Sequence, residues 1–332
     1  MNGAETGTPG PLEMSAPGRF RTAVGIAVHA LLVSLTVLPP LTLFVPAIVL
    51  SAAFRYGQRA ARLVLVVTVT VMLLGSLAGG SEASLAGFTA AGLLVFQIGF
   101  PALLLAQHAE RRIPSGQAFL ATFGMALLGV VVVEGIMRIA WGHSPYAGFV
   151  AEAGSVFDQA IAMNAQLPKE YLGMMRKVGD VIVASFLPAV ITANTAIMFL
   201  VGVVMIPRLK RGDPEAVQYK LRFFALPDWV LLAFIVSGLS PFAEGQLRTA
   251  GLNVLAIVAL LYWVQGLAVV RMLMSRSPVG FLASAPAFVL LGLVSFNLVG
   301  MAVLFLTGLF DSFFDFRNLK RKEDSDESDL DG

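Results

Sequence analysis

Long runs of apolar residues, almost free of charge, restrict what this sequence can fold into. There are nine such blocks, at 22–38, 41–54, 61–77, 86–107, 117–139, 179–206, 229–242, 249–270 and 279–312. Blocks of about twenty apolar residues have the length that a helix needs to cross the hydrocarbon of a bilayer. The sequence therefore predicts an all-α, polytopic helical membrane protein with about eight to ten transmembrane helices.

The composition supports this class and excludes several kinds of chemistry. The chain is 57% hydrophobic and only 13% charged, whereas a soluble domain carries about 25% charged residues. It has no cysteine and only three histidines, which lie far apart in sequence. Disulfides, iron–sulfur clusters and thiolate metal sites are excluded, and the histidine spacing fits no metal centre. We therefore expect no cofactor, no metal and no large soluble catalytic domain.

The basic residues alternate along the chain and predict its topology. The clusters are Arg19/Arg21, Arg55/Arg59/Arg62, Arg111/Arg112, Arg208/Lys210/Arg211, Arg271/Arg276 and Arg317/Lys320/Arg321/Lys322. The connections between them, at 39–40, 78–85, 140–178 and 243–248, are short and uncharged, acidic or balanced. Because Lys and Arg are retained on the cytoplasmic side, both termini are predicted to be cytoplasmic and 140–178 external. These cations lie beside apolar blocks, which fits topology better than nucleic-acid binding.

Two apolar blocks do not have the length of one crossing. The block 279–312 is about 34 residues long, where one crossing needs about 20, and basic clusters flank both of its ends. Two crossings that turn near Ser295–Asn297 satisfy both clusters. The block 229–242 is short, and a tilted or re-entrant segment is expected there.

The chain is expected to form one membrane domain between two tails. Residues 1–18 are rich in Gly, Pro, Ser and Thr and are predicted to be disordered, as is the charged segment 316–332, while 19–315 form the helical membrane domain. Where the last block ends, Asp311, Asp315 and Arg317 favour a cap at the membrane surface with local ion pairing. Ligation of a bound group is the alternative.

The connection 140–178 is predicted to be helical and amphipathic. Apolar residues recur at helical spacing from Phe149 through Val156 to Ile161, and Pro168 can open a second helix. One interpretation is a pair of interfacial helices on the outer leaflet. The other is a lid over a binding cavity.

Several polar residues within or beside the spans are candidates for ligand binding. Glu134 and Arg138 lie one helical turn apart at the end of a span, where an ionisable group is a functional candidate. The others are an amide or phenol inside an apolar block: Asn194, Asn253, Tyr262 and Gln265. Hydrogen bonding between neighbouring helices is the structural alternative for the amides, and snorkelling to the interface is the alternative for the charged pair.

The first span carries a possible face for helix packing. Ala23 and Ala27 stand four residues apart and allow another helix to approach closely, in this chain or in a partner membrane protein. The sequence contains no phosphate-binding loop, nucleophile elbow or metal-ligand cluster. The chain is therefore not expected to be an enzyme.

Three stretches resemble a known family. The segments "GLFDSFFDFRNLKRK", "NVLAIVALLYWVQGLAVV" and "PPLTLFVPAIVLSAAFRYGQRAA" are similar to the YybS-like family of bacterial membrane proteins, and the middle of the chain matches in its pattern of spans. The resemblance implies a multi-pass protein of the bacterial inner membrane. The N-terminal half of that family resembles the S components of energy-coupling-factor vitamin transporters. Those proteins dock on their partner through an Ala-x-x-x-Ala face, which Ala23 and Ala27 match in spacing.

Two functions are consistent with these patterns. The first is a non-enzymatic protein that binds a small molecule or a partner membrane protein within the bilayer, with an S-component-like transport role. The second is a scaffold or assembly protein without a ligand. A polar cavity lined by the candidate residues would favour the first, and a closed bundle with amides paired between helices would favour the second.

Overall fold

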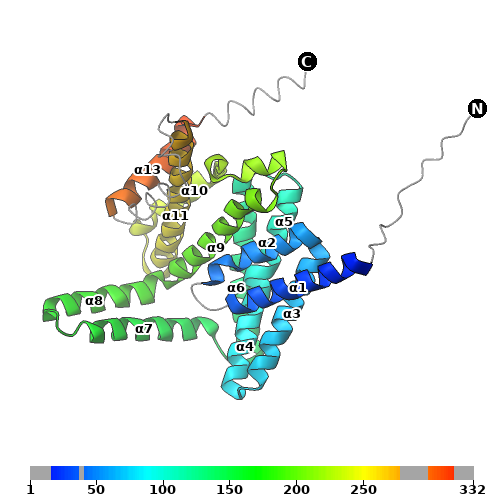
Figure 1. Cartoon of the computed structure of the whole chain (residues 1–332). Helices are drawn as coiled ribbons and strands as arrows, with labels where there is room; N and C mark the ends of the chain where they lie inside the picture. The colour runs from blue at the N-terminus through cyan, green and yellow to red at the C-terminus, as the bar shows by residue number, and fades with distance from the viewer. Residues whose placement is uncertain (1–15, 37–40, 277–297, 318–332) are drawn as a thin grey trace, which may run out of the picture.

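The computed structural model describes residues 16–36, 41–276 and 298–317, and every regular element in these ranges is a helix (Figure 1). Within these described ranges, five helices are long and apolar enough to cross a membrane: Gln58–Leu77, Ala83–Glu110, Ser115–Trp141, Lys169–Leu209 and Gly245–Arg276. Four shorter apolar helices accompany them: Thr22–Leu35, Leu41–Tyr56, Trp229–Phe242 and Val299–Phe314. The all-α, polytopic class is confirmed, and the number of eight to ten crossings stays a prediction.

The N-terminal helices pack as a group of three. They are α1 (Ala16–Thr36), α2 (Val45–Tyr56, after the 3₁₀ turn Leu41–Phe44) and α3 (Gln58–Leu77). Apolar residues such as Val33, Val49 and Ala61 are fully buried between them. His29 is also buried, with its Nδ1 2.8 Å from Gly25 O and its Nε2 3.2 Å from Ser51 Oγ, so it joins α1 to α2. This histidine is a structural group in the core.

The next two long helical segments form one side of the candidate site. The first is α4 (Ser81–Leu93), a π-helix η2 (Leu94–Gly99) and α5 (Phe100–Glu110), and the second is α6 (Ser115–Trp141). At the end of α6, Gly142 adopts a left-handed φ of 63°, and its N–H bonds to Arg138 O. This conformation is inexpensive for glycine, and it ends the helix and turns the chain toward the next one.

The predicted amphipathic connection forms a helical hairpin, but its second helix does not stop where the next span was expected to begin. The elements are α7 (Pro145–Met163), α8 (Lys169–Val181), a π-helix η3 (Ile182–Phe186) and α9 (Leu187–Leu209). The boundary expected near residue 178 is absent, because α8 continues through η3 into α9. Figure 1 shows α7 and α8 side by side, projecting away from the bundle.

The C-terminal helices pack around one very close crossing. After the short 3₁₀ turns η4 (Pro214–Tyr219) and η5 (Leu221–Phe223) come α10 (Trp229–Gly238), the 3₁₀ turn η6 (Ser240–Phe242), α11 (Gly245–Arg276) and α13 (Leu298–Phe314). A Cβ added to Gly266 would lie 1.9 Å from Leu304 O, and one added to Gly308 would lie 1.9 Å from Tyr262 O. The backbones of α11 and α13 therefore touch where both helices carry glycine.

Helices α11 and α13 run in the same direction, so both end at one end of the bundle. Tyr262 meets Gly308, Gln265 reaches Asp311, and Arg276 bonds to Arg317 O at 3.1 Å. This parallel arrangement is the one that two crossings within 279–312 require. The first of those crossings and the turn expected near Ser295–Asn297 lie outside the described residues.

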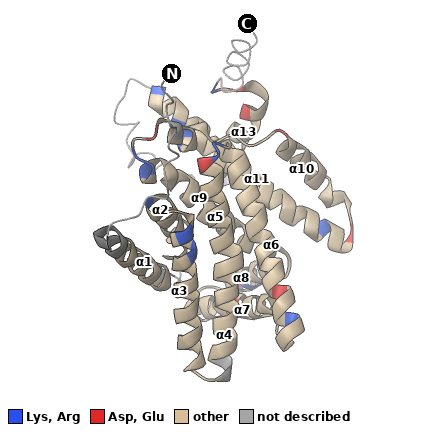
Figure 2. Cartoon of the chain, turned by 90° about the vertical axis from the view of Figure 1, so that its right-hand side faces the viewer, with Lys and Arg blue, Asp and Glu red and all other residues tan. Residues whose placement is uncertain are grey.

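Several basic clusters gather at that same end. The hydroxyl of Tyr219 donates to Ile113 O at 2.6 Å and lies 3.2 Å from His108 O, which joins the turn after α5 to the connection after α9. Arg317 donates to Arg222 O and Phe224 O, which adds the end of α13. Figure 2 shows most Lys and Arg toward this end of the molecule, in the upper half of the view. The side of the membrane that this end faces stays a prediction.

Candidate functional site

A cavity lies where η2, α6, α7 and α9 meet, and it brings two of the predicted residues together. Its volume is about 440 Å³. The lining is mostly apolar, with four polar residues: Gln97, Glu134, Tyr146 and Asn194. The apolar lining consists of Leu93, Val130, Val131, Val133, Pro145, Phe149, Val190 and Ile191. A largely apolar pocket with a few polar groups is typical of a site for a small molecule.

The π-helix η2 shapes one wall of the cavity. A Cβ added to Gly129 of α6 would lie 2.2 Å from Phe96 O, so α6 rests directly on the backbone of η2. Gln97 lies in this π-helix and lines the cavity. Single π-turns inside α-helices often occur at functional sites. Gln97 was missed from the sequence, although an amide within the apolar block 86–107 was a signal of the same kind as Asn194.

The amides of the cavity present oxygen atoms that are free to accept hydrogen bonds. The hydroxyl of Thr195 donates to Ile191 O at 3.0 Å, so its oxygen accepts from Gln97 Nε2 at 2.8 Å. This fixes the amide so that Gln97 Oε1 is the atom left over. Asn194 Nδ2 lies 3.9 Å from Met198 Sδ, a weak partner, and Asn194 Oδ1 accepts no bond within the described residues.

Glu134 joins the end of α6 to the first turn of α7. Its Oε1 accepts from Ser144 Oγ at 2.6 Å, and its Oε2 accepts from the backbone N–H of Tyr146 at 2.9 Å. Ser144 is itself the N-cap of α7 and accepts from Ala147 N. A carboxylate at a helix N-terminus is favoured by the helix dipole and by unpaired N–H groups. The contacts hold Pro145 and Tyr146, two lining residues, over the cavity.

Arg138 pairs with Glu134 but does not line the cavity. Its Nε lies 2.6 Å from Glu134 Oε1, and its side chain is 61% exposed against 21% for Glu134. Its NH2 group donates to Ser144 Oγ at 3.3 Å. The exposure of Arg138 is compatible with snorkelling, which stays a prediction, whereas Glu134 also bonds to Ser144 and Tyr146.

Asn253 lies away from the cavity and satisfies backbone groups of a neighbouring helix. Its Oδ1 accepts from Ala189 N at 2.9 Å, and its Nδ2 donates to Ser185 O at 2.6 Å and to Thr249 O at 2.8 Å. Ser185 belongs to the π-helix η3 and Ala189 to the first turn of α9, where the helical ladder is interrupted. Asn253 therefore acts as an interhelical tie between α11 and α9.

Gln265 also serves the fold, at the basic end of the bundle. Its Oε1 accepts from Leu226 N at 3.0 Å, and its Nε2 lies 3.1 Å from Asp311 Oδ2. Tyr262, one turn earlier, is buried and packs edge-on against Phe234 and Phe305. Neither residue reaches the cavity, so the set predicted from the sequence divides between a cavity and two structural clusters.

The ion pair at the end of α13 is buried, which differs from the surface cap that the sequence suggested. Arg317 NH2 lies 2.6 Å from Asp311 Oδ2, and the two side chains are only 1% and 3% exposed. Arg317 also donates through NH1 to Phe224 O at 2.7 Å. The pair is buried because the connection 221–226 packs over it and accepts hydrogen bonds from Arg317. Arg317, which the sequence pattern assigns to the charged tail, thus belongs to the packed domain.

Ala23 and Ala27 are both exposed, so they do not pack against another helix of this chain. The buried face of α1 carries Gly25, His29 and Ala30 instead. The backbone of α1 approaches its neighbour at Gly25, where an added Cβ would lie 2.4 Å from the ring of Tyr56. Close packing within the chain therefore uses the other side of α1 from the one predicted.

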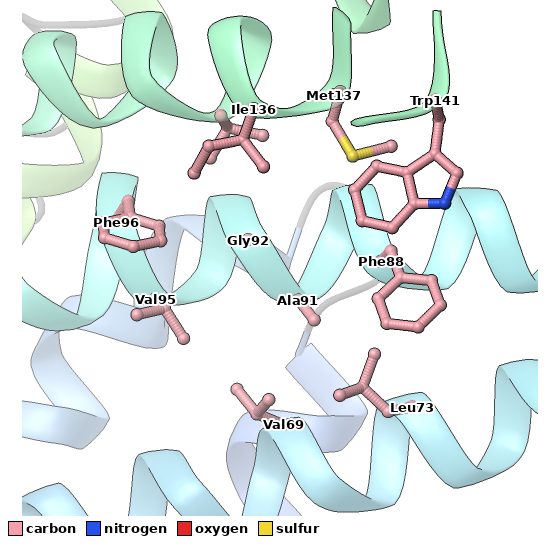
Figure 3. Close-up of a pocket in the computed structure, with 11 residues that line it drawn as sticks. Val69, Leu73, Phe88, Ala91, Gly92, Val95, Phe96, Ile136, Met137 and Trp141 are labelled. Atoms are coloured by element: carbon pink, nitrogen blue, oxygen red, sulfur yellow. The ribbon is translucent and has the colours of Figure 1, made fainter. Parts of the chain in front are cut away.

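A second hollow is a mostly apolar groove between α3, α4 and α6, of about 250 Å³ (Figure 3). Its labelled residues include Leu73, Phe88, Met137 and Trp141, and Phe88 stacks on Trp141 at a centroid distance of 5.5 Å. Val133 lines both the groove and the cavity. Apart from the indole N–H of Trp141, the lining side chains are apolar, so the groove suits lipid tails.

No group of three or more His, Cys, Asp or Glu side chains that could hold a metal ion is present among the described residues. The candidate site is therefore the cavity and its polar residues.

One family matches most of the chain. It is described as predicted membrane protein, DUF2232, and it matches residues 26–312. The chain belongs to this family. The match extends from the first helix through α13 and includes all four polar residues of the cavity, so the DUF2232 region and the described membrane domain largely coincide. No curated protein and no solved structure matches the chain.

Proposed function

We propose that this DUF2232 protein binds a small, largely apolar molecule within the bilayer, in the cavity between η2, α6, α7 and α9. The observation that carries the proposal is the convergence of Gln97, Glu134 and Asn194, from three separate helices, on one apolar cavity. Polar groups in a membrane span are costly and usually mark a ligand path or a helix contact. Asn253 and Gln265 have such helix contacts, while the oxygens of Gln97 and Asn194 do not.

The first turn of α7 acts in this proposal as the cover of the site. Pro145, Tyr146 and Phe149 line the cavity, and Glu134 holds this turn by two hydrogen bonds. The lid interpretation and the interfacial interpretation are then compatible. One end of the hairpin closes the cavity, while the rest lies along the membrane surface. The exposed apolar residues Tyr171, Met174 and Val178 of α8 favour such a position.

The test is mass spectrometry of small molecules that copurify with the full chain in mild detergent. Val190→Phe fills the cavity from a position that is half exposed, so it should fold. Val254→Phe on α11 is the control, because Val254 is similarly exposed and lies away from the cavity. A compound should be retained by the wild type and by Val254→Phe and lost from Val190→Phe. Equal compound profiles in all three proteins would contradict the proposal.

A transport role with a partner protein is the finer form of this proposal. Its support is the exposed pair Ala23 and Ala27 on α1 and the S-component-like resemblance of the N-terminal half. Leu at both positions should then reduce copurification of a partner while leaving thermal stability unchanged, because both side chains are exposed. Unchanged copurification would leave this face to lipid and favour a role without a docked partner.

The location proposed is the bacterial inner membrane, with the basic end of the bundle in the cytoplasm and α7 outside. The positions of the Lys and Arg clusters support this orientation. Alkaline phosphatase fused within 145–165 should be active, and the same reporter fused to the C-terminus should be inactive. An active C-terminal fusion would contradict the orientation and the two crossings in 279–312.

A further inference from the structure

Several hydrogen-bond acceptors of the cavity keep free capacity. Among the described residues that line it there is one carboxylate, and there is no Lys, Arg or His. One N–H of Gln97 Nε2 donates to Thr195 Oγ1, and Gln97 Oε1 is free to accept. Asn194 also has its oxygen free, and Glu134 Oε2 accepts only one hydrogen bond, from Tyr146 N. A carboxylate oxygen can accept two, so this atom keeps capacity.

The charged lining residue of the cavity is the acidic Glu134. Arg138, the ion-pair partner of Glu134, is 61% exposed and directs its Nε and NH2 to Glu134 and Ser144. An anionic ligand would find no guanidinium or ammonium group among the lining residues, and it would lie beside a carboxylate. Burying an unpaired charge next to a like charge is expensive in an apolar site.

We infer that the ligand is a neutral or cationic amphiphile, with an apolar body and a polar end that donates hydrogen bonds, such as an amine or a hydroxyl group. This rests on the proposed function and specifies its ligand class. The apolar lining residues from α6 and α9 hold the body, and the oxygens of Gln97, Asn194 and Glu134 receive the donors. A fatty carboxylate of the same length is rejected, because its charge would lie beside Glu134 with no cation among the described lining residues.

Three probes with the same ten-carbon body separate these classes: decylamine, decanol and decanoate. Each is added at equal concentration to the purified full chain near neutral pH, and occupancy is read by native mass spectrometry. Decylamine and decanol should bind at least about tenfold more tightly than decanoate, a difference of about 1.4 kcal/mol. Decanoate binding as tightly as the other two would overturn the inference.

Variants show whether the binding is in the cavity. Glu134→Gln removes the carboxylate charge with little change of volume, and it should reduce the advantage of the amine and the alcohol over decanoate. Glu152→Gln, at an exposed position of α7, is the matched control and should change nothing. If Glu134→Gln keeps the full preference, the ligand class is wrong.

The cavity-filling variant separates a failure of the inference from a failure of the proposed function. If Val190→Phe abolishes binding of all three probes and decanoate is among the tight ones, the cavity binds small molecules of another class. If Val190→Phe changes none of the occupancies, the probes associate elsewhere, and the proposed function fails together with the inference.

Discussion

Glu134 Oε2 accepts a hydrogen bond from the backbone N–H of Tyr146 at 2.9 Å, so a side chain in the last turns of one helix caps the first turn of the next. Helix N-terminal N–H groups have no partner within their own helix, and a carboxylate is a strong one. This bond ties the start of α7, which carries the lining residues Pro145 and Tyr146, to the end of α6.

Replacing Glu134 and its neighbour should give unequal losses of stability. Glu134→Ala removes hydrogen bonds to Ser144, Tyr146 and Arg138 and should cost about 1–3 kcal/mol. Arg138→Ala removes one exposed pair and should cost less than about 1 kcal/mol. Unfolding of the detergent-solubilised variants measures both. The double variant should resemble Glu134→Ala, and a double variant clearly more stable than Glu134→Ala would indicate a buried pair instead.

The ion pair between Asp311 and Arg317 should behave differently, because it is buried. Arg317→Met leaves the carboxylate of Asp311 in the interior without its partner and should cost about 3–5 kcal/mol. Asp311 Oδ1 has no hydrogen-bond partner, and the neutral amide of Gln265 at Oδ2 does not replace the charge of Arg317. Combining Arg317→Met with Asp311→Leu should recover part of the loss. If each single variant costs less than about 1 kcal/mol, the pair is hydrated and the packing of 221–226 over it is incorrect.

The crossing of α11 and α13 should not tolerate a single added methyl group. Gly266→Ala places a Cβ against Leu304 O, which is backbone and cannot move aside without separating the helices. We expect a loss of about 1–3 kcal/mol, as for other overpacked sites. Gly124→Ala in α6, where nothing lies within 4 Å of the added Cβ, is the control and should be neutral or stabilising. Equal behaviour of the two variants would contradict the close crossing.

The burial of Tyr219 should make the protein less stable at alkaline pH. Burial raises its pKa from 10.0 to about 12, because the phenolate would be desolvated. The unfolded chain therefore releases this proton first, so the contribution of Tyr219 is complete below pH 10 and is lost as the pH rises through 12. The shift corresponds to about 2–3 kcal/mol. Between pH 10 and 12 the free energy of unfolding should fall more steeply with pH in the wild type than in Tyr219→Phe. Parallel curves for the two proteins would contradict a raised pKa for Tyr219.

The helical membrane class was accessible from the sequence because it depends on the length of the apolar blocks and on little else. The hydrogen-bond partners of the polar side chains could not be predicted from the sequence, because they depend on which helices meet. Asn253 and Gln265 looked like Asn194 in the sequence, yet only Asn194 lies in the cavity. Gln97 was overlooked because a π-helix, which has no clear sequence signal here, turns it toward α9. The sequence predicts Arg317 in a solvated tail, because it does not show that residues 221–226 pack over this side chain.

The chain contains no cysteine, so one introduced thiol can report on the cavity directly. Asn194→Cys would line the cavity, whereas Ile197→Cys, three residues along α9, lies exposed outside it. Thiols react as thiolates, which form in a polar setting far more readily than in hydrocarbon.

The decisive measurement is the rate at which a small maleimide labels each single-cysteine protein in native membranes, with and without added decanol. If the cavity is a binding site, Asn194→Cys is labelled faster than Ile197→Cys, and decanol slows only the labelling at position 194. Equal rates at the two positions, with no protection by decanol, would contradict the account.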